Sequence, residues 1–198
     1  MLGKHLRPLE RRIFERLTPK VAIHPNTVSL LTVPPAALSV YFLARSNFLA
    51  AGLLILLSLI LDMMDGALAR AGKRATPFGA YLDPMMDKLV EFCVYLGLFL
   101  AGFPLEAFLA FNGILLIGAA KAWAYTVVPG KNEDWPSIGE RSERYLLLFL
   151  SFALAIAGLS FFGQHPVKLV LWLIIILVAI GTLQRMLFAK RLIENRKQ

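Results

Sequence analysis

Residues 62–87 read Asp62-Met63-Met64-Asp65-Gly66-Ala67-Leu68-Ala69-Arg70, then eight residues, then Gly79-Ala80-Tyr81-Leu82-Asp83-Pro84-Met85-Met86-Asp87. In an α-helix, residues three or four apart lie on the same face, about one turn from each other. This spacing puts the carboxylates of each half into a pair. Long apolar runs precede and follow the stretch, so we expect two membrane helices joined by the polar turn Ala71–Pro77. Each helix would carry its acidic pair near the same membrane surface.

Four carboxylates at one depth require a counter-charge. An ionisable side chain inside a bilayer costs roughly 2.5–3.5 kcal/mol, and neighbouring like charges add to that cost. The nearby protein cations are Arg70 and Lys88. Oxygen ligands without Cys or His select hard ions such as Mg²⁺, Mn²⁺ or Ca²⁺, and Mg²⁺ is commonly held by a few carboxylates together with substrate phosphates. The pattern therefore predicts one or two divalent cations; the alternative is a set of solvated charges at helix ends.

The same stretch carries a family resemblance. Asp-x-x-Asp-Gly-x-x-Ala-Arg, eight residues, Gly-x-x-x-Asp-x-x-x-Asp resembles the signature of the CDP-alcohol phosphatidyltransferase family, with every fixed position present. The resemblance implies a membrane enzyme of phospholipid biosynthesis. Such an enzyme transfers a phosphatidyl-type group from a CDP-linked lipid, such as CDP-diacylglycerol or CDP-archaeol, to an alcohol and releases CMP. It also implies a homodimer.

The resemblance assigns roles to the acidic residues and their neighbours. Two divalent ions, Mg²⁺ or Mn²⁺, would be held against the donor diphosphate by Asp62, Asp65, Asp83 and Asp87. Asp87 is also placed as general base, although the sequence leaves open whether it acts as base, as ligand or as both. The residues implied to bind the CDP part of the donor are Asn26, Thr27, Val28, Ser29, Gly66, Ala69, Arg70, Thr76 and Gly79. Gly66 and Ala69, with little or no side chain, also suit plain helix packing.

The composition indicates an integral membrane protein, because 58% of the 198 residues are hydrophobic and 17% are charged. Six apolar runs are each close to the ~20 residues that span a bilayer. They cover roughly residues 28–44, 48–70, 79–101, 104–128, 142–162 and 166–189. We therefore expect an all-α polytopic fold with six transmembrane helices. Pro34-Pro35 should bend or break the first of them, and Cys93 is predicted to serve packing.

The N-terminal segment and the loops predict how the chain sits in the membrane. Residues 1–20 place Leu and Ile at helical spacing between Lys and Arg, which is typical of an amphipathic helix on a membrane surface. We expect residues 1–22 to form this helix and residues 23–198 to form the membrane domain; an ordinary helix packed on the protein is the alternative. Asn26 or Thr27 is predicted to cap the first membrane helix, with His24 as a loop residue.

Charge sets the predicted orientation. The formal net charge is +8, and the loops on one side of the predicted helices hold nearly all of the Lys and Arg. The positive-inside rule then places both termini and the acidic motif on the cytoplasmic side of the cell membrane. Anionic lipid and topology account for the positive charge, so nucleic acid is not an expected partner.

Three later helices offer cations for a polar, phosphorylated acceptor: Lys121, Arg141, Arg144 and Arg185. Alternatives are local ion pairs with Glu140 and Glu143 for the central two, and snorkelling for the other two. These segments resemble phosphatidylinositol phosphate synthases, which makes inositol phosphate the leading acceptor. Trp123 departs from that branch, which carries Arg there, so glycerol phosphate and other alcohols stay open. The linker Pro129–Gly139 is either a lid over the acceptor or a passive loop.

Two other function classes compete with the enzyme. A transporter that relays ions through membrane carboxylates predicts acidic residues spread along the membrane normal and inverted repeats. This chain clusters its carboxylates at one depth and has no obvious inverted repeat. An idle lipid-binding scaffold is the other alternative, and the complete acidic set argues against it.

Overall fold

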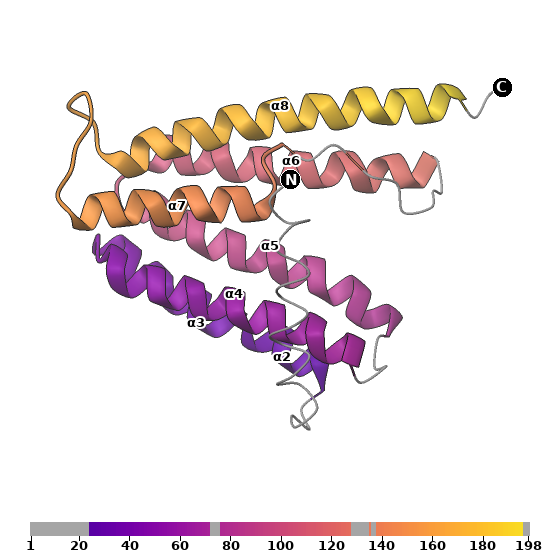
Figure 1. The fold of residues 1–198 in the computed structure, drawn as a ribbon, viewed down its shortest axis with the longest axis horizontal. Helices are drawn as coiled ribbons and strands as arrows, with labels where there is room; N and C mark the ends of the chain where they lie inside the picture. Colours follow the sequence, from indigo (N-terminus) through magenta and orange to yellow (C-terminus); the bar gives the residue numbers. More distant parts are fainter. Residues whose placement is uncertain (1–23, 72–75, 128–134, 136–137, 196–198) are drawn as a thin grey trace. The chain divides into compact units, whose positions relative to one another are not determined.

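The computed structural model describes residues 24–71, 76–127, 135 and 138–195, which are helical apart from short connections (Figure 1). The predicted amphipathic helix of residues 1–22 lies outside these ranges. Within them the fold is all-helical, and the extended pairing is limited to one isolated bridge between Phe161 and Gln164. The helices form two compact units, one ending at Pro104 and the other starting at Leu105.

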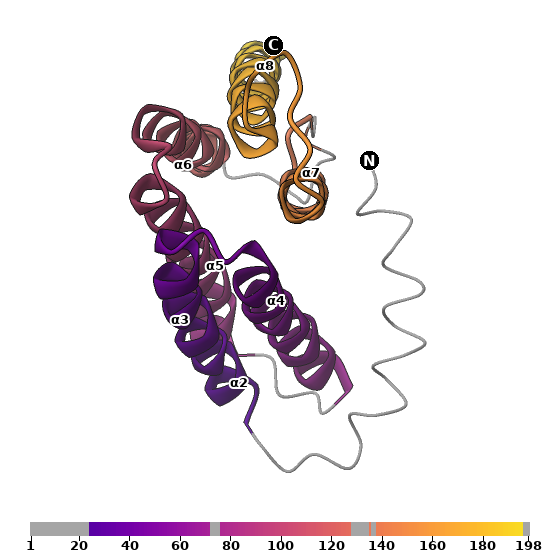
Figure 2. The same cartoon turned by 90° about the vertical axis from the view of Figure 1, so that its left-hand side faces the viewer.

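The described part of the first unit contains four helices: α2 (Pro25–Leu31), α3 (Val33–Ala44), α4 (Phe48–Ala71) and α5 (Pro77–Leu100). Helix α3 packs against both α4 and α5, and α2 also contacts both of them (Figure 2). Small side chains allow this close packing, as expected for helices in lipid. A Cβ atom at Gly97 of α5 would lie 2.6 Å from Cδ1 of Leu43 in α3. Cys93 is buried beside Ala36 and Val90, which confirms its predicted packing role.

The first predicted span is broken, as its two prolines require. Helix α2 ends at Leu31, Thr32 lies between the helices, and α3 starts with Val33 and the prolines at its first turn. A proline lacks an N–H group and cannot continue the preceding helical ladder. Beside the break, the Ser58 hydroxyl of α4 donates a hydrogen bond of 2.7 Å to the Thr32 carbonyl oxygen, which ties the junction of α2 and α3 to a neighbouring helix.

The predicted cap of the first helix is wrong. Helix α2 begins at Pro25, and the cap is His24, whose Nδ1 accepts a hydrogen bond of 3.3 Å from the Asn26 N–H. Proline suits the first helical position because its fixed φ is helical and its missing N–H would be unpaired there anyway. The helix therefore starts before the Asn26 and Thr27 side chains can cap it, and His24 has a defined structural role.

The second unit consists of three helices: α6 (Pro104–Val127), α7 (Arg141–Ile156) and α8 (Pro166–Asn195). Helix α7 packs against α8. Helix α7 is shorter than the apolar run 142–162 suggested. It ends at Ile156, and Gly158 just beyond it turns the chain with a φ of +68°. The Gly158 N–H donates to the Ala155 carbonyl and the Leu159 N–H donates to the Leu154 carbonyl. Glycine adopts this left-handed conformation without steric cost, which makes it a common helix terminator.

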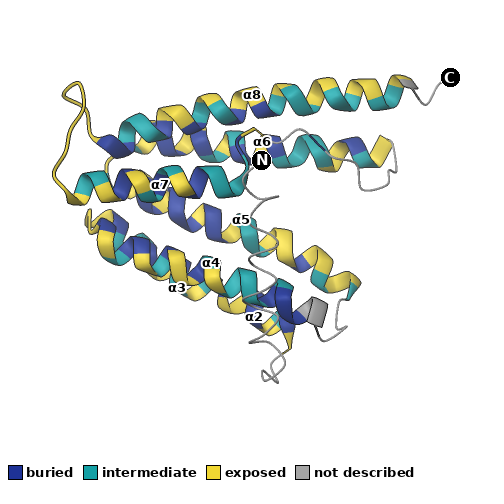
Figure 3. Cartoon of the chain, in the orientation of Figure 1, coloured by how far each residue is buried: buried dark blue, intermediate teal, exposed yellow. Residues whose placement is uncertain are grey.

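Among the residues that the structure describes, four helical segments are long and apolar enough to cross a membrane: Pro25–Ala44, Phe48–Leu68, Pro104–Val127 and Pro166–Glu194. The protein is thus a multi-pass membrane protein. Helix α5 differs because its first half carries several charged residues, and α7 has only 16 residues. Buried and exposed residues alternate around each helix, so that one side faces a neighbour and the other is apolar and exposed (Figure 3). Exposed apolar faces of this kind are expected where lipid is the solvent.

Candidate active site

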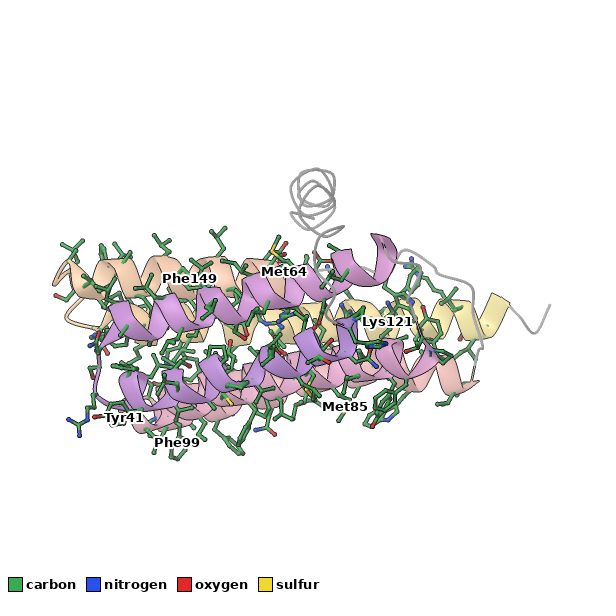
Figure 4. All side chains as sticks on the ribbon, turned by 90° about the horizontal axis from the view of Figure 1, so that it is seen from below. Tyr41, Met64, Met85, Phe99, Lys121 and Phe149 are labelled. Carbon is green, nitrogen blue, oxygen red and sulfur yellow. The ribbon has the colours of Figure 1, made fainter. Side chains whose placement is uncertain are left out.

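Three of the four predicted carboxylates meet in the first unit. Asp62 lies in the C-terminal half of α4, and Asp83 and Asp87 lie one turn apart in the N-terminal half of α5. One carboxylate oxygen from each lies within 4.8 Å of the other two, a spacing that could hold a metal ion. Helices α4 and α5 both pack on α2 and α3, which brings the two acidic segments together. Met64 and Met85, labelled in Figure 4, mark these segments on the two helices.

Asp65 lies deeper than the other three carboxylates. Its side chain is buried, with 5% of the residue exposed. The side chain of Ser29 in α2 provides a hydrogen bond to this carboxyl group, and the charges of Asp62 and Asp83 act on it. Its Oδ2 atom has no hydrogen-bond partner among the residues that the structure describes. A buried carboxylate oxygen without a donor is costly, and a cation is a natural partner for it.

The donor set of this acidic site fits a divalent cation. All the groups offered are carboxylate oxygens, from Asp62, Asp83 and Asp87, with Asp65 behind them. Oxygen-only sets select hard ions such as Mg²⁺, Mn²⁺ or Ca²⁺. Three carboxylates held this close repel one another unless positive charge lies between them. Both the chemistry and the spacing thus fit bound metal.

Four of the residues predicted to bind the CDP part lie around the starts of α2 and α5: Asn26, Thr27, Thr76 and Gly79. A Cβ atom at Gly79 would lie 3.0 Å from Oδ1 of Asn26 and 3.2 Å from Oγ1 of Thr76. The Thr76 hydroxyl oxygen caps α5 by accepting a hydrogen bond of 2.9 Å from the Gly79 N–H. Asn26 is half-buried and Thr27 is exposed. These residues are therefore gathered at one end of the first unit.

The other predicted CDP residues are placed less uniformly. Val28 and Ser29 are buried within the first unit, where Ser29 reaches Asp65. Gly66 is half-buried and follows Asp65 in α4. Ala69 and Arg70 continue α4, and their side chains lie outside what the structure describes.

The predicted acceptor cations all belong to the second unit. Arg185 of α8 donates a hydrogen bond of 2.6 Å to the Ile117 carbonyl of α6 and interacts with the charges of Glu140 and Arg144. Arg141 lies over the Tyr145 ring, with 5.6 Å from its guanidinium carbon to the ring centroid. Lys121, labelled in Figure 4, is half-buried on α6.

Arg144 is the one buried side chain among the four, and it supports the turn before α7. It is 5% exposed, and its guanidinium group donates to the Gly139 carbonyl. Glu143 closes the same turn by accepting hydrogen bonds from the Gly139 and Glu140 N–H groups, at 2.9 Å and 3.3 Å. With Glu140 as the first residue of this capping box, the start of α7 is a hydrogen-bonded turn.

Two groups near these sites were not anticipated from the sequence. Glu91 is buried one turn below Asp87 on α5, and its carboxylate pairs with the Lys88 ammonium group at 2.5 Å. Lys88 is therefore bound to Glu91 rather than being simply a counter-charge for the acidic motif. The i, i+3 spacing of the pair was the available signal. The second group is Trp135, which is buried although it lies in the predicted linker.

Comparison with known proteins shows similarity to one family of transferases and to two of its named relatives. A sequence model of the CDP-alcohol phosphatidyltransferase family matches residues 22–180. Archaetidylinositol phosphate synthase of Pyrococcus horikoshii is 29% identical over 199 residues, covering 98% of this chain and 99% of that protein. Phosphatidylinositol phosphate synthase of Streptomyces avermitilis is 28% identical over 211 residues, covering 100% of this chain and 84% of that protein.

The fold is shared with a solved structure. Mycobacterium tuberculosis phosphatidylinositol phosphate synthase with CDP-DAG bound superposes with a TM-score of 0.73 at 20% identity, covering 92% of this chain and 94% of that one. The same enzyme in complex with manganese and citrate gives a TM-score of 0.71 at 22% identity, covering 88% and 86%.

Proposed function

Because the chain belongs to the CDP-alcohol phosphatidyltransferase family, we propose that it transfers a phosphatidyl-type group from a CDP-linked lipid to inositol phosphate. Family membership makes the protein a membrane-embedded transferase, and it confirms the resemblance carried by residues 62–87. The acceptor is our proposal. It is supported by two relatives that match almost the whole chain, one named archaetidylinositol phosphate synthase and the other phosphatidylinositol phosphate synthase.

The observation that carries the proposal is the acidic site of Asp62, Asp83 and Asp87, with Asp65 buried beside it. These four residues would hold divalent metal, Mg²⁺ or Mn²⁺ and two ions in all, against the donor diphosphate. Bound metal would supply charge neutralisation for the departing CMP phosphate. Manganese in the related solved structure supports a divalent ion here.

Asp87 is proposed as the general base of the transfer. The acceptor hydroxyl oxygen attacks the lipid-side phosphorus, and the bond from that phosphorus to the oxygen of CMP breaks as the new P–O bond forms. The hydroxyl proton passes to the Asp87 carboxylate, which belongs to the acidic site and is half-buried rather than enclosed. CMP leaves with the electron pair of the broken bond.

The donor nucleotide would bind at the starts of α2 and α5. Asn26, Thr76 and Gly79 lie against one another there, because the missing side chain of Gly79 lets Asn26 approach the α5 backbone closely. Thr27, Val28, Ser29, Gly66, Ala69 and Arg70 complete the proposed donor site. Ser29 and Val28 would act from the interior, by supporting Asp65 and the turn, because both are buried.

For the acceptor phosphate we propose Lys121, Arg141 and Arg185, and we assign Arg144 to the support of the α7 turn. Trp123, which stands where phosphatidylinositol phosphate synthases carry Arg, does not disturb the Lys121 side chain. Two residues along a helix are separated by about 200° around its axis, and Trp123 is 66% exposed. The tryptophan therefore occupies a different face of α6 from the lysine.

In the membrane we propose six spans, with α5 and α7 added to the four apolar segments, and a domain of residues 23–198 preceded by a surface helix of residues 1–22. The charges of α5 would be accommodated because several of them face the acidic site or pair with each other. The Lys and Arg content of the loops supports a cytoplasmic active site. We further propose a homodimer, as the family resemblance implies.

The test is a CMP-release assay with purified protein in bilayers. CDP-diacylglycerol and CDP-archaeol are each offered with inositol phosphate, glycerol phosphate, serine, inositol or glycerol. We expect divalent-metal-dependent CMP release with inositol phosphate, and its loss in Asp83→Asn and Asp87→Asn. Preference for glycerol phosphate would overturn the acceptor and keep the reaction class. Ion flux in liposomes without CMP release would instead support the transporter alternative.

A further inference from the structure

Trp135 is tied to two helices of the second unit. Its indole Nε1–H donates a hydrogen bond of 3.0 Å to the Tyr125 hydroxyl oxygen of α6. Its ring meets the Tyr125 ring edge to face at 5.7 Å and the Phe188 ring of α8 at 5.1 Å. Aromatic pairs in this geometry attract each other beyond simple burial, and a bonded indole N–H removes the cost of burying it. Trp135 is 9% exposed, so it is an anchor and not a solvated loop residue.

Tyr125 in turn lies under a cation. The Lys121 Nζ atom is 5.8 Å from the centroid of the Tyr125 ring, within the range of a cation–π contact. Lys121 and Tyr125 are four residues apart on α6 and share a face. The Trp135 indole donates its hydrogen bond to the Tyr125 hydroxyl and so restrains the tilt of the Tyr125 ring. The Lys121 ammonium group lies over the face of this same ring.

The helix that supports Trp135 also holds the neighbouring cation. Arg185, three residues before Phe188 on α8, donates to the carbonyl of Ile117, one turn before Lys121 on α6. One turn before Arg185 in α8, a Cβ atom at Gly181 would overlap the Ile138 carbonyl oxygen. The chain shortly after Trp135 therefore also lies directly on this helix. These contacts hold α8, which carries Arg185, against α6, which carries Lys121.

We propose that Trp135 and Tyr125 are positioning residues, which hold the Lys121 ammonium group in place for the anionic group of the acceptor. This inference rests on the proposed function, in which Lys121 binds the acceptor phosphate. A lysine side chain has four rotatable bonds, and binding must otherwise restrict them. Contact with the restrained Tyr125 ring limits the conformations of the Lys121 side chain before binding, so less conformational entropy is lost when the acceptor binds.

The test compares variants that remove the Trp135–Tyr125 hydrogen bond while keeping aromatic rings at both positions. Trp135→Phe and Tyr125→Phe should each raise the KM for inositol phosphate about fivefold, the order expected for one hydrogen bond. The KM for the CDP-linked donor and kcat should stay within twofold of the parent protein, roughly the assay's resolution. Because both changes remove one shared bond, the double variant should be no worse than the poorer single variant.

Two control variants make the outcome decisive. Trp123→Phe changes an exposed tryptophan on the same helix and should leave both KM values unaltered. Lys121→Met reports the proposed function itself: an unchanged acceptor KM there would refute the role of Lys121, and with it this inference. If Lys121→Met raises the acceptor KM but Trp135→Phe and Tyr125→Phe do not, the positioning role alone is refuted. Additive losses in the double variant, or equal rises in donor KM, would show a general structural role instead.

Discussion

Gly79, in the first turn of α5, faces Asn26 of α2 so closely that a Cβ atom added at Gly79 would lie 3.0 Å from the Asn26 Oδ1 atom. Two segments that are about 50 residues apart in the sequence therefore form one surface beside the acidic site. The contact explains why the signature requires glycine at this position, where any side chain would push Asn26 away.

The first prediction concerns this contact. Gly79→Ala should raise the KM for the CDP-linked donor about fivefold, the order expected for one lost hydrogen bond, because the added methyl group displaces the Asn26 side chain. The KM for the acceptor should change little. Ala80→Ser, at an exposed neighbouring position, is the matched control. A normal donor KM in Gly79→Ala would remove Asn26 and Gly79 from the donor site.

The second prediction concerns metal. Treatment with EDTA should lower CMP release by about 100-fold or more, because the charge on the departing phosphate is then not neutralised. Addition of excess Mg²⁺ or Mn²⁺ should restore the rate. Asp62→Asn should shift the metal concentration needed for half-maximal rate upward, as one ligand of the site is lost. Full activity in EDTA would contradict the proposed metal role of the acidic site.

A third prediction separates two arginines that the sequence treats alike. Arg144→Met should lower the free energy of unfolding by about 1–3 kcal/mol, because the Gly139 carbonyl loses its buried donor. Arg141→Met should leave stability nearly unchanged and raise the acceptor KM. Thermal unfolding in detergent and the CMP-release assay measure the two effects. The assignment fails if Arg144→Met is as stable as the parent protein.

A fourth prediction addresses the broken first span. Ser58→Ala should lower the free energy of unfolding by about 1–3 kcal/mol, since the Thr32 carbonyl at the break then has no hydroxyl donor in a buried place. Ser39→Ala is the control, because the Ser39 hydroxyl bonds the Ala36 carbonyl within its own helix. Equal effects of the two changes would mean that the break is satisfied in another way.

Local patterns predicted most of the helices closely. The apolar runs matched the helices to within a few residues for α4, α5 and α6, because length and apolarity are properties of each segment alone. Pro34-Pro35 predicted the break, for a covalent reason that no partner changes. The start of α2 was predicted too late in the chain, because Pro25 begins the helix and His24 caps it before Asn26 or Thr27 can do so. The end of α7 was missed because one glycine conformation ended the helix inside an apolar run.

The acidic motif was readable in the sequence because its spacing on each helix follows from helical geometry alone, and that geometry pairs the carboxylates before any folding is considered. Which carboxylates meet across helices depends on packing, and packing brought Asp83 and Asp87 to Asp62 while burying Asp65. The same holds for the cations: Arg141 and Arg144 are equivalent as residue types. The turn at Gly139 takes up one of them, because the folded turn brings the Gly139 carbonyl to the Arg144 guanidinium group five residues later, and residue type alone does not determine that pairing.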